Sequence, residues 1–263
     1  MHPRDRRERI LELLRDSDSG RLTVEELAQR LKISPETIRR DLTQLSSGSL
    51  VSKFHGGAAL PQPSGEGPFR ARMAESLREK RSIARAAAGL FRPGDTLLVD
   101  TGSTTVVFAE ELARQTGLTV ITNSVTIAQT VTRGRNGNHA FLIGGEYSDE
   151  AMENLGALAV RQVAQFHAIH AVITVGAIEI EGAMDYTLEE AEVARAMIAQ
   201  ARKLTVVADS SKLEKAGLFR VCRLDVIDRI VTDARPKGAL SDALAAAEVE
   251  VLVAPLRTSQ PRS

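Results

Sequence analysis

The sequence predicts an α/β domain with a mostly parallel sheet, preceded by a small winged helix-turn-helix domain. Residues 22–45, LTVEELAQRLKISPETIRRDLTQL, have the apolar spacing of two short helices joined by a tight turn. From residue 96 onward, short apolar segments alternate with helical ones. The segment 61–68, PQPSGEGP, has linker composition. We therefore expect the helix-turn-helix domain over 1–60, the linker over 61–68, the α/β domain over 69–255 and a tail over 256–263.

Composition narrows the class of protein. With 263 residues and 43% hydrophobic content, the chain can bury a full core. The formal net charge of +0 gives no indication of a nucleic-acid partner, so charge has to be interpreted by segment. The single cysteine, Cys222, excludes an intramolecular disulfide, and it has no spacing typical of a metal site, so no cofactor is expected. No apolar run approaches the ~18 residues that a membrane helix needs, which predicts a cytoplasmic protein with no membrane partner.

Capping residues mark the starts of two helices in the first domain. Thr23 followed by Glu26 is a capping-box signature, so a helix is expected to begin after Thr23. Ser34 is a suitable cap for the next helix, and Pro35 suits its first position, where a missing N–H is no loss. A further helix over 6–15 carries Arg6, Arg7 and Arg9 near its start, where an external phosphate could compensate their charge.

The helix that begins at Pro35 has the character of a recognition helix. Ile38, Leu42 and Leu45 repeat at helical spacing and are expected to face inward. The arginines on the opposite face suit the major groove, because arginine makes bidentate bonds to guanine. An isolated Arg39-Arg40 pair is more often a solvated helix face. Here a capped helix, a short turn, Ser-Pro and a second amphipathic helix occur together, and this combination favours DNA binding. The candidate DNA contacts on this helix are Ser34, Glu36, Thr37, Arg39, Arg40, Thr43 and Gln44.

Residues 50–57 are predicted to form the wing. Residues 50–54, LVSKF, have strand composition and precede a His55-Gly56-Gly57 turn. In a hairpin beside the recognition helix, Lys53 and His55 would reach the DNA backbone or minor groove. Simple solvent exposure is nearly as good an explanation for either residue.

The turn after the first strand of the α/β domain resembles a phosphate cradle. A strand over 96–100 is followed by DTGSTT over 100–105 and a helix over 106–113. Backbone N–H groups and the positive end of the helix dipole converge on such a turn, and Ser103, Thr104 and Thr105 add hydroxyl groups. An ordinary helix capped by a hydroxyl explains the same residues equally well.

The alternation then repeats, with strands predicted over 118–122, 140–143, 171–175, 204–208 and 229–232 and a long helix over 69–90 before the first strand. Polar residues follow several of these strands. Parallel sheets bind ligands at the carboxyl ends of their strands, so one shared site is expected. Its candidate residues are Asp100, Gly102, Ser103, Thr104, Thr105, Asn123, Gly144, Gly145 and Lys212.

Two sets of motifs resemble the DeoR family of bacterial transcriptional regulators. ISPETIRRDL over 33–42, with FHGGAAL over 54–60, is similar to the family's DNA-binding signature. Lys80, DTGST over 100–104, TNS over 122–124, EEA over 189–191 and DSSK over 209–212 are similar to its sensor domain, which itself resembles sugar-phosphate isomerases. GAMDY over 182–186 is similar to the glycerol-phosphate-repressor side of the family.

The resemblance implies a repressor of a carbohydrate or polyol catabolic operon, released from double-stranded operator DNA by a phosphorylated sugar or polyol. One short recognition helix contacts few base pairs, so a homo-oligomer is expected. Two alternatives are also compatible with the sequence. One is a sugar-phosphate isomerase with a DNA-binding appendage, in which Asp100, Glu146, Glu190 and Asp209 are candidate bases. The other is an architectural DNA-binding protein without a ligand. We predict the repressor, which is not an enzyme.

Overall fold

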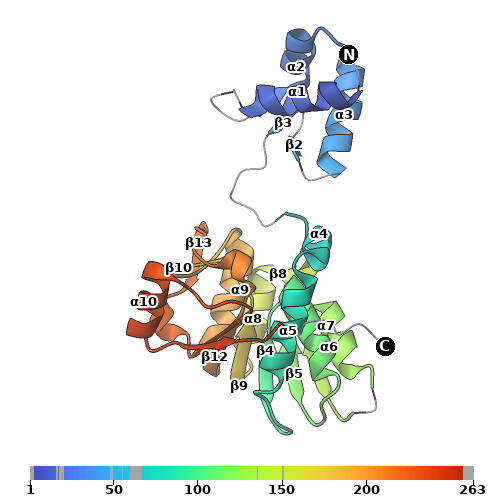
Figure 1. Ribbon diagram of the computed structural model, residues 1–263. Helices are drawn as coiled ribbons and strands as arrows, with labels where there is room; N and C mark the ends of the chain where they lie inside the picture. The colour runs from blue at the N-terminus through green and yellow to red at the C-terminus, as the bar shows by residue number, and fades with distance from the viewer. Residues whose placement is uncertain are drawn as a thin grey trace, which may run out of the picture. The chain divides into compact units, whose positions relative to one another are not determined.

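The computed structural model describes residues 3–15, 17, 21–47, 50–54, 56–59, 67–134, 136–149 and 151–256. The chain divides into two compact units, Met1–Gly67 and Pro68–Ser263, and each is described by itself (Figure 1). Most of the predicted linker, 61–66, and of the predicted tail, 257–263, lies outside the described residues. In the part of the chain that is described, no helix is long and apolar enough to cross a membrane.

The first unit is a winged helix-turn-helix, as predicted. Helices α1 (Pro3–Arg15), α2 (Val24–Leu31) and α3 (Pro35–Ser47) pack against a three-stranded sheet of β1 (Arg21–Thr23), β2 (Ser52–Phe54) and β3 (Gly57–Ala59). The strand order is β1-β3-β2 and both pairings are antiparallel. Ile38, Leu42 and Leu45 are buried in the core with Ile10, Leu14 and Leu27, which confirms the inward face of the recognition helix.

Local hydrogen bonds explain where α2 begins and how the wing is attached. The Thr23 N–H donates to Glu26 Oε2 at 2.7 Å and the Glu26 N–H donates to Thr23 Oγ1 at 3.1 Å, so the predicted capping box forms. The helix ends at Lys32, which has a left-handed φ of 54°. Gly56, with a φ of 88°, turns the chain between β2 and β3, and its carbonyl accepts the Val24 N–H at 2.8 Å.

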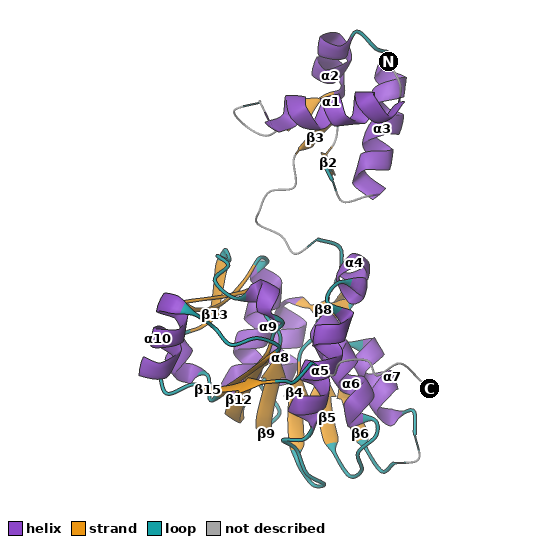
Figure 2. Cartoon of the chain, viewed as in Figure 1, coloured by secondary structure: helices purple, strands orange, loops and turns teal. Residues whose placement is uncertain are grey.

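The second unit is built on a seven-stranded sheet with the order β15-β14-β12-β9-β4-β5-β6 (Figure 2). Every neighbouring pair in this sheet is parallel, as the alternation of strands and helices predicted. The strands are β4 (Thr96–Val99), β5 (Thr119–Thr122), β6 (His139–Leu142), β9 (Ala168–Ile173), β12 (Ala201–Val207), β14 (Arg229–Thr232) and β15 (Glu250–Val253). The sequence did not predict β15.

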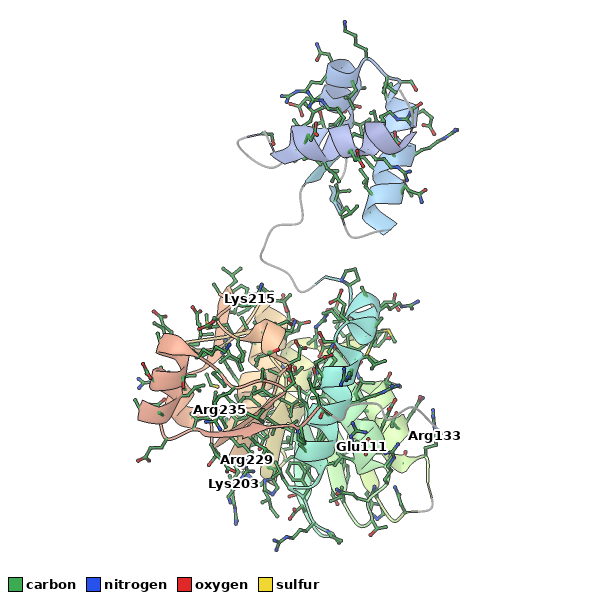
Figure 3. The ribbon with its side chains drawn as sticks, in the orientation of Figure 1. Glu111, Arg133, Lys203, Lys215, Arg229 and Arg235 are labelled. Atoms are coloured by element: carbon green, nitrogen blue, oxygen red, sulfur yellow. The ribbon has the colours of Figure 1, made fainter. Side chains whose placement is uncertain are left out.

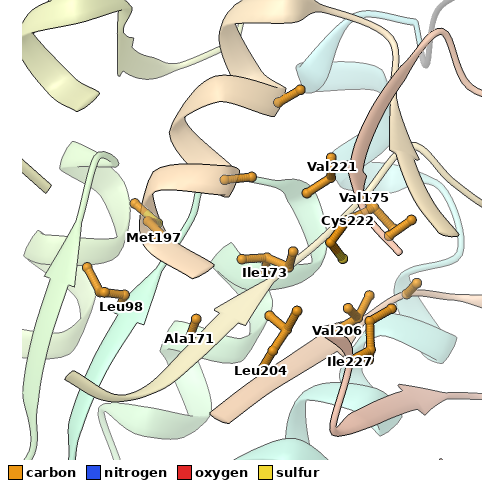
Figure 4. Packing of buried hydrophobic residues seen from close by; sticks show 14 of the residues in the cluster. Leu98, Ala171, Ile173, Val175, Met197, Leu204, Val206, Val221, Cys222 and Ile227 are labelled. Carbon is orange, nitrogen blue, oxygen red and sulfur yellow. The ribbon is translucent and has the colours of Figure 1, made fainter. Parts of the chain in front are cut away.

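Helices cover both faces of the sheet. On one face are α5 (Leu77–Ala88), α6 (Ser103–Leu112) and α7 (Val125–Thr132), and on the other are α8 (Gly156–Val163), α9 (Leu188–Ala199) and α10 (Gly238–Ala246). Successive side chains of a strand point to opposite faces of the sheet. Leu97 and Val99 therefore belong to a first core, under α5 to α7, and Leu98 belongs to a second core, under α8 to α10. Figure 4 shows the second core, where Leu98, Ala171 and Ile173 meet Met197 of α9.

The prediction of one helix over 69–90 is wrong. The segment forms α4 (Phe69–Ala74) and α5, separated by Glu75 and by Ser76 with a left-handed φ of 48°. The buried Lys80 ammonium stabilises this break, because it donates to the carbonyls of Arg72 at 2.5 Å and Glu75 at 2.8 Å. A lysine one turn into α5 thus supplies donors for carbonyls that the end of α4 leaves without helical partners.

Short antiparallel strands that the sequence did not predict occur in the segments that connect the strands of the seven-stranded sheet. They form a hairpin of β7 (Glu146–Ser148) and β8 (Glu153–Leu155), and a three-stranded sheet of β10 (Ala177–Glu179), β11 (Gly182–Asp185) and β13 (Phe219–Cys222). Two 3-10 helices, η1 (Ser210–Lys212) and η2 (Leu224–Val226), complete this unit.

The order of the strands locates the point where a ligand site is expected. The chain runs outward from β4 through β5 to β6, returns to place β9 beside β4, and then continues through β12, β14 and β15 in the opposite direction. In open α/β sheets of this kind, ligands bind at the carboxyl ends of the two strands where the order reverses. These strands are β4 and β9.

Candidate functional site

Helix α3 presents an exposed, charged face. Arg39 and Arg40 are 57% and 81% exposed, and both form long ion pairs with Glu36, at 3.7 Å and 3.8 Å. Arg39 also lies 4.0 Å from Glu25 of α2. Exposed pairs of this length contribute little stability, so both guanidinium groups remain able to exchange Glu36 for another partner. The structure therefore brings the predicted arginines to the surface, where a DNA groove could receive them.

The hydroxyl residues of α3 have structural bonds as well. The Thr37 N–H donates to Ser34 Oγ at 3.3 Å, which confirms Ser34 as the cap, and the two hydroxyl oxygens lie 2.9 Å apart. The Thr43 hydroxyl donates to the Arg39 carbonyl at 2.8 Å, while Gln44 is exposed. Lys53 lies in β2, but its side chain and the whole of His55 lie outside the described part of the chain.

Arg6 is not available for a phosphate, which corrects the expectation from the sequence. Its guanidinium forms a bidentate pair with the buried Asp41 carboxylate, in which Nη2 donates to Oδ1 at 3.0 Å and Nε donates to Oδ2. The hydrogen bond to Asp41 raises the pKa of Arg6. Arg9 is likewise paired, with Glu12 at 2.5 Å. The start of α1 thus fastens that helix to α3, and Asp41 of the TIRRDL motif has a structural role.

At the reversal point of the larger sheet, β4 and β9 are joined through Asp100. One oxygen of its buried carboxylate accepts the Thr174 N–H at 3.0 Å. Gly102 lies against the same residue, because a Cβ built on Gly102 would be 2.0 Å from Thr174 Cγ2. The φ of Gly102 is 178°, so the glycine is required by this close approach and not by its backbone conformation.

The turn after β4 leads directly into α6, which begins three residues earlier than predicted. Ser103, Thr104 and Thr105 therefore form the first helical turn, and all three are buried. Their N–H groups have no acceptor within the helix. No side chain caps this helix, and in the described structure neither the Ser103 nor the Thr104 hydroxyl makes a hydrogen bond. The hydroxyl-capped alternative thus lacks the bond that defines it, and the turn retains the donors that a phosphate needs.

Asn123, which follows β5, is fully buried and bonded to protein groups. Its Nδ2 donates to Glu153 Oε2 at 2.6 Å and to the Asn154 carbonyl at 3.2 Å, and its Oδ1 accepts the Thr101 hydroxyl at 3.0 Å. Asn123 therefore links the β4 turn to β8. The sequence did not indicate Glu153, because no local motif marks a residue that is 30 positions from its partner.

Carboxylates gather around Asp100. Burial is the main cause that raises the pKa of Asp100 well above its ordinary value, and the charges of Glu153, Asp185 and Glu190 add to the increase. Burial also raises the pKa of Glu153, with further contributions from Glu190 and Asp185. Glu146, another candidate base of the isomerase alternative, is exposed on β7. No three carboxylate, histidine or cysteine side chains in the described ranges are placed to hold a metal ion.

Gly144 and Gly145 have packing roles at the far edge of the sheet. The Gly144 N–H donates to Gln162 Oε1 at 2.9 Å. A Cβ on Gly145 would lie 2.5 Å from the Leu155 carbonyl oxygen, so glycine is needed where the chain crosses the start of α8. Both residues follow β6, two strand spacings or about 10 Å from β4.

Lys212 lies in η1, which follows β12, and β12 is two strands from β4 on the other side of β9. Its loop is organised by two carboxylates. Asp209 accepts the Ser211 N–H at 3.0 Å, and Asp233 accepts the Ser210 N–H at 2.6 Å. Figure 3 labels two other cations of this region, Lys203 in the first half of β12 and Arg229 at the start of β14, so both lie towards the amino ends of their strands and not at the carboxyl edge. Lys212 is therefore a cation at the carboxyl edge, where the candidate site lies.

Comparison with known proteins identifies both units. A model of the DeoR-like helix-turn-helix domain matches residues 6–64, and one of the DeoR C-terminal sensor domain matches residues 75–234. The transcriptional repressor AccR of Agrobacterium fabrum is 36% identical over 232 residues, covering 87% of this chain and 89% of the relative. The glycerol-3-phosphate regulon repressor of Escherichia coli is 30% identical over 236 residues, covering 89% and 92%.

Among solved structures, ribose 5-phosphate isomerase A from Methanocaldococcus jannaschii has a TM-score of 0.37 and 16% identity, over 52% of this chain and 54% of that chain. A similarity of this size carries no argument about activity. The full-length relatives are named as repressors and not as enzymes, so the isomerase alternative is not supported. On the two domain matches and these relatives, the chain belongs to the DeoR family of transcriptional regulators.

Proposed function

We propose that this protein represses a carbohydrate or polyol catabolic operon and leaves its operator when a phosphorylated sugar or polyol binds the α/β unit. The observation that carries the proposal is the first turn of α6 at the reversal point of the sheet. Three N–H groups and two unbonded hydroxyls converge there, beside the carboxylate of Asp100. This is the chemistry of a phosphate site next to groups that accept hydrogen bonds from sugar hydroxyls.

The DNA-binding role rests on the exposed face of α3. In the major groove, Arg40 would bind a guanine edge, while Arg39 and the residues around the helix start would contact phosphates and neighbouring bases. Thr37, Thr43 and Gln44 lie on or beside this face, and Ser34 and Glu36 lie at its start. Lys53 of β2 belongs to the wing, which in this arrangement would follow the DNA backbone.

The proposed effector site lies at the carboxyl edge of β4, β9 and β12. Gly102 to Thr105 would hold the phosphate, and Lys212 would add a positive charge from the β12 side. Asp100 would accept bonds from hydroxyl groups of the effector. Asn123 would act indirectly, since its amide is bonded to Glu153 and Thr101 and holds the turn in place. The hydrogen bond from Gly144 to Gln162 gives Gly144 and Gly145 a structural role at the edge of this site.

The relatives support this class of effector. One of them is named as the repressor of a glycerol-3-phosphate regulon, and glycerol 3-phosphate is a phosphorylated polyol. We further propose that the protein acts as a homo-oligomer, because a single recognition helix reads only part of an operator and two half-sites supply the remaining specificity.

A binding experiment tests the proposal directly. A DNA fragment would be selected from a random library with the full-length protein, and its affinity measured by fluorescence anisotropy at fixed salt. Glycerol 3-phosphate and hexose 6-phosphates would be added, with glycerol, glucose and inorganic phosphate as matched controls. At least one phosphorylated compound should weaken DNA binding about 5- to 150-fold, the usual range of allosteric coupling.

The same coupling must be reciprocal, so the effector should bind more weakly to the DNA-bound protein by the same factor. A compound that the protein converts to a product without releasing DNA would instead establish an enzyme. Release by inorganic phosphate alone would contradict recognition of the sugar or polyol.

A further inference from the structure

Strand β6 is an exposed, apolar edge of the seven-stranded sheet. Among the described strands it pairs only with β5, on one side (Figure 2). Phe141 and Leu142 are 51% and 46% exposed. Successive side chains of a strand point to opposite faces, so both faces of the sheet are incompletely covered at this edge. The opposite edge strand, β15, is better protected, because Val251 to Val253 are half-buried.

Two residues of β6 have backbone N–H and C=O groups that could bond to a further strand. The His139 N–H donates to the Leu118 carbonyl at 2.9 Å, and the Ile143 N–H donates to the Thr122 carbonyl at 2.8 Å. In a parallel ladder, every second residue faces the neighbouring strand, so Ala140 and Leu142 turn their N–H and C=O groups away from β5. Within the described ranges, these outward groups have no hydrogen-bond partner.

A row of unpaired N–H and C=O groups is satisfied by another strand. Natural edge strands usually exclude such pairing with lysine, proline or a bulge, and β6, with the sequence HAFL, has none of these. We propose that two copies of this chain associate through antiparallel pairing of their β6 strands, which joins two seven-stranded sheets into one. This inference specifies the surface used in the proposed homo-oligomer and rests on that part of the proposed function.

The register of this pairing follows from bonds already present within one copy. The Asn138 N–H donates to Asn136 Oδ1 at 3.1 Å, and the Gly144 N–H donates to Gln162 Oε1 at 2.9 Å. These bonds occupy the N–H groups on either side of Ala140 and Leu142. Only a twofold axis at Phe141 pairs Ala140 with Leu142 of the second copy and uses all the free groups in four hydrogen bonds. The two Phe141 residues then face each other, with Cα atoms about 4.5 Å apart.

The apolar surface around β6 suits a second copy. The Phe141 ring lies 5.6 Å, centroid to centroid, from Phe166. Exposed Tyr147 lies on β7, which follows β6 in the chain, and exposed Leu158 lies on α8, whose Gln162 is bonded to Gly144 just after β6. Half-exposed side chains of this size offer roughly 300–400 Å² per copy. A stable interface needs about 800 Å² per partner, of which slightly more than half is apolar. The exposed apolar side chains therefore account for most of the apolar area that such an interface needs. Backbone and polar groups would supply the rest of the buried area.

Cross-linking tests the pairing at one defined position. The variant Phe141→Cys would place two thiols opposite each other within the 4.4–6.8 Å Cα separation that a disulfide allows. The native Cys222 will not compete, because it is buried and burial raises its pKa to about 12. Mild oxidation should convert Phe141→Cys to a covalent dimer. The control Leu218→Cys, at a side chain that is 63% exposed away from β6, should remain uncross-linked.

Two further variants test the contact without an oxidant. Phe141→Lys would bring two ammonium groups together, and Leu142→Pro would remove an outward N–H that the β5–β6 ladder does not use. Each should halve the mass measured by sedimentation velocity, with an unchanged circular dichroism spectrum. If either variant unfolds, the other variant and the cross-link still decide the question.

The possible outcomes separate the surface from the function. A wild-type oligomer with no Phe141→Cys cross-link, and with variants of unchanged mass, would show that the copies meet elsewhere while leaving the proposed function intact. A wild-type protein that is monomeric, on DNA and free, would overturn both the β6 pairing and the proposed assembly. A cross-linked dimer that no longer binds DNA would support the pairing and count against a role for this dimer in repression.

Discussion

Gly102 and Thr174 are in contact at the reversal point of the sheet, so close that a Cβ on Gly102 would lie 2.0 Å from Thr174 Cγ2. The turn after β4 can therefore pack directly against the end of β9 only because residue 102 has no side chain. Because Thr174 also donates its N–H to Asp100, the same contact fixes the carboxylate beside the α6 turn.

The first prediction concerns this contact. Gly102→Ala should destabilise the α/β unit by about 1–3 kcal/mol, the usual cost of overpacking. Thr174→Ser removes Cγ2, the atom that the new Cβ would meet. The double variant Gly102→Ala/Thr174→Ser should therefore regain most of the lost stability. Urea denaturation of the four proteins in a double-mutant cycle measures the coupling. Equal losses in the single and double variants would mean that the glycine is needed for another reason.

The second prediction separates the phosphate cradle from a helix cap. Because neither hydroxyl caps α6, Ser103→Ala/Thr104→Ala should lose no capping bond, and its cost in the free energy of unfolding, about 0.8 kcal/mol, should come mainly from the buried Thr104 methyl group. It should nevertheless abolish release of DNA by the effector. The matched control is Ser124→Ala, since the Ser124 hydroxyl does accept the Ile127 N–H at 3.4 Å.

Ser124→Ala should therefore cost about 1 kcal/mol and retain the effector response. Melting temperature, DNA affinity and effector response would be measured on both proteins. A Ser103→Ala/Thr104→Ala protein that still releases DNA at the same effector concentration would exclude the cradle.

The third prediction concerns Arg40 of α3. Arg40→Ala should weaken binding to the selected DNA by about 1–3 kcal/mol and relax the preference at one base pair, because the exposed guanidinium is free to reach a guanine edge. Arg39→Ala should weaken binding to all sequences and reduce the salt dependence. Footprinting and salt-controlled titrations distinguish the two effects. An unchanged base preference in Arg40→Ala would show that α3 is not placed in the groove as proposed.

The fourth prediction contrasts Arg6 with those surface arginines. Arg6→Met leaves the buried Asp41 carboxylate without its cation, so the winged helix should lose about 2–4 kcal/mol, somewhat less than the 3–5 kcal/mol for fully buried pairs. The double variant Arg6→Met/Asp41→Leu should recover much of that stability. Hydrogen exchange of the amides in α1 and α3 reports on this unit alone. Exchange rates equal to those of the wild type would show that the pair contributes nothing.

The fifth prediction is a pH dependence. Because the pKa of Glu153 is raised in the folded protein, the folded state holds a proton that the unfolded state has released. The stability that this proton gives is therefore full below the ordinary Glu pKa of about 4.3 and declines as the pH rises towards the folded value. Glu153→Gln removes the titration and can still accept the Asn123 bond. The stability of this variant relative to the wild type should therefore grow as the pH rises through this range.

Glu146→Gln, the same substitution at an exposed carboxylate on β7, is the matched control for this experiment. Thermal unfolding between pH 5 and pH 8 provides the measurement. A Glu153→Gln profile parallel to that of the wild type would contradict the expected pH dependence.

Local signals in the sequence were sufficient to predict the winged helix and the parallel sheet. Thr23 and Ser34 mark helix starts through bonds to residues three positions away, and these bonds form as expected, while Pro35 occupies the first position of α3. Strand-helix alternation likewise predicts a parallel sheet, since each strand needs a crossover to reach its neighbour. The same rules failed over 69–90, where Ser76 adopts a left-handed conformation that Lys80 stabilises from the following helix.

By itself, the sequence determined where α2 and α3 begin, that the main sheet is parallel, and which arginines lie on the outward face of α3. Only the tertiary structure decided that Arg6 pairs with Asp41, that Asn123 is bonded to Glu153, and that Gly102 meets Thr174. Capping and side-chain periodicity depend on neighbours within one or two turns, so they can be deduced from the sequence. The other contacts join residues 30 or more positions apart, and they exist only because packing of the core sets the order of strands and helices.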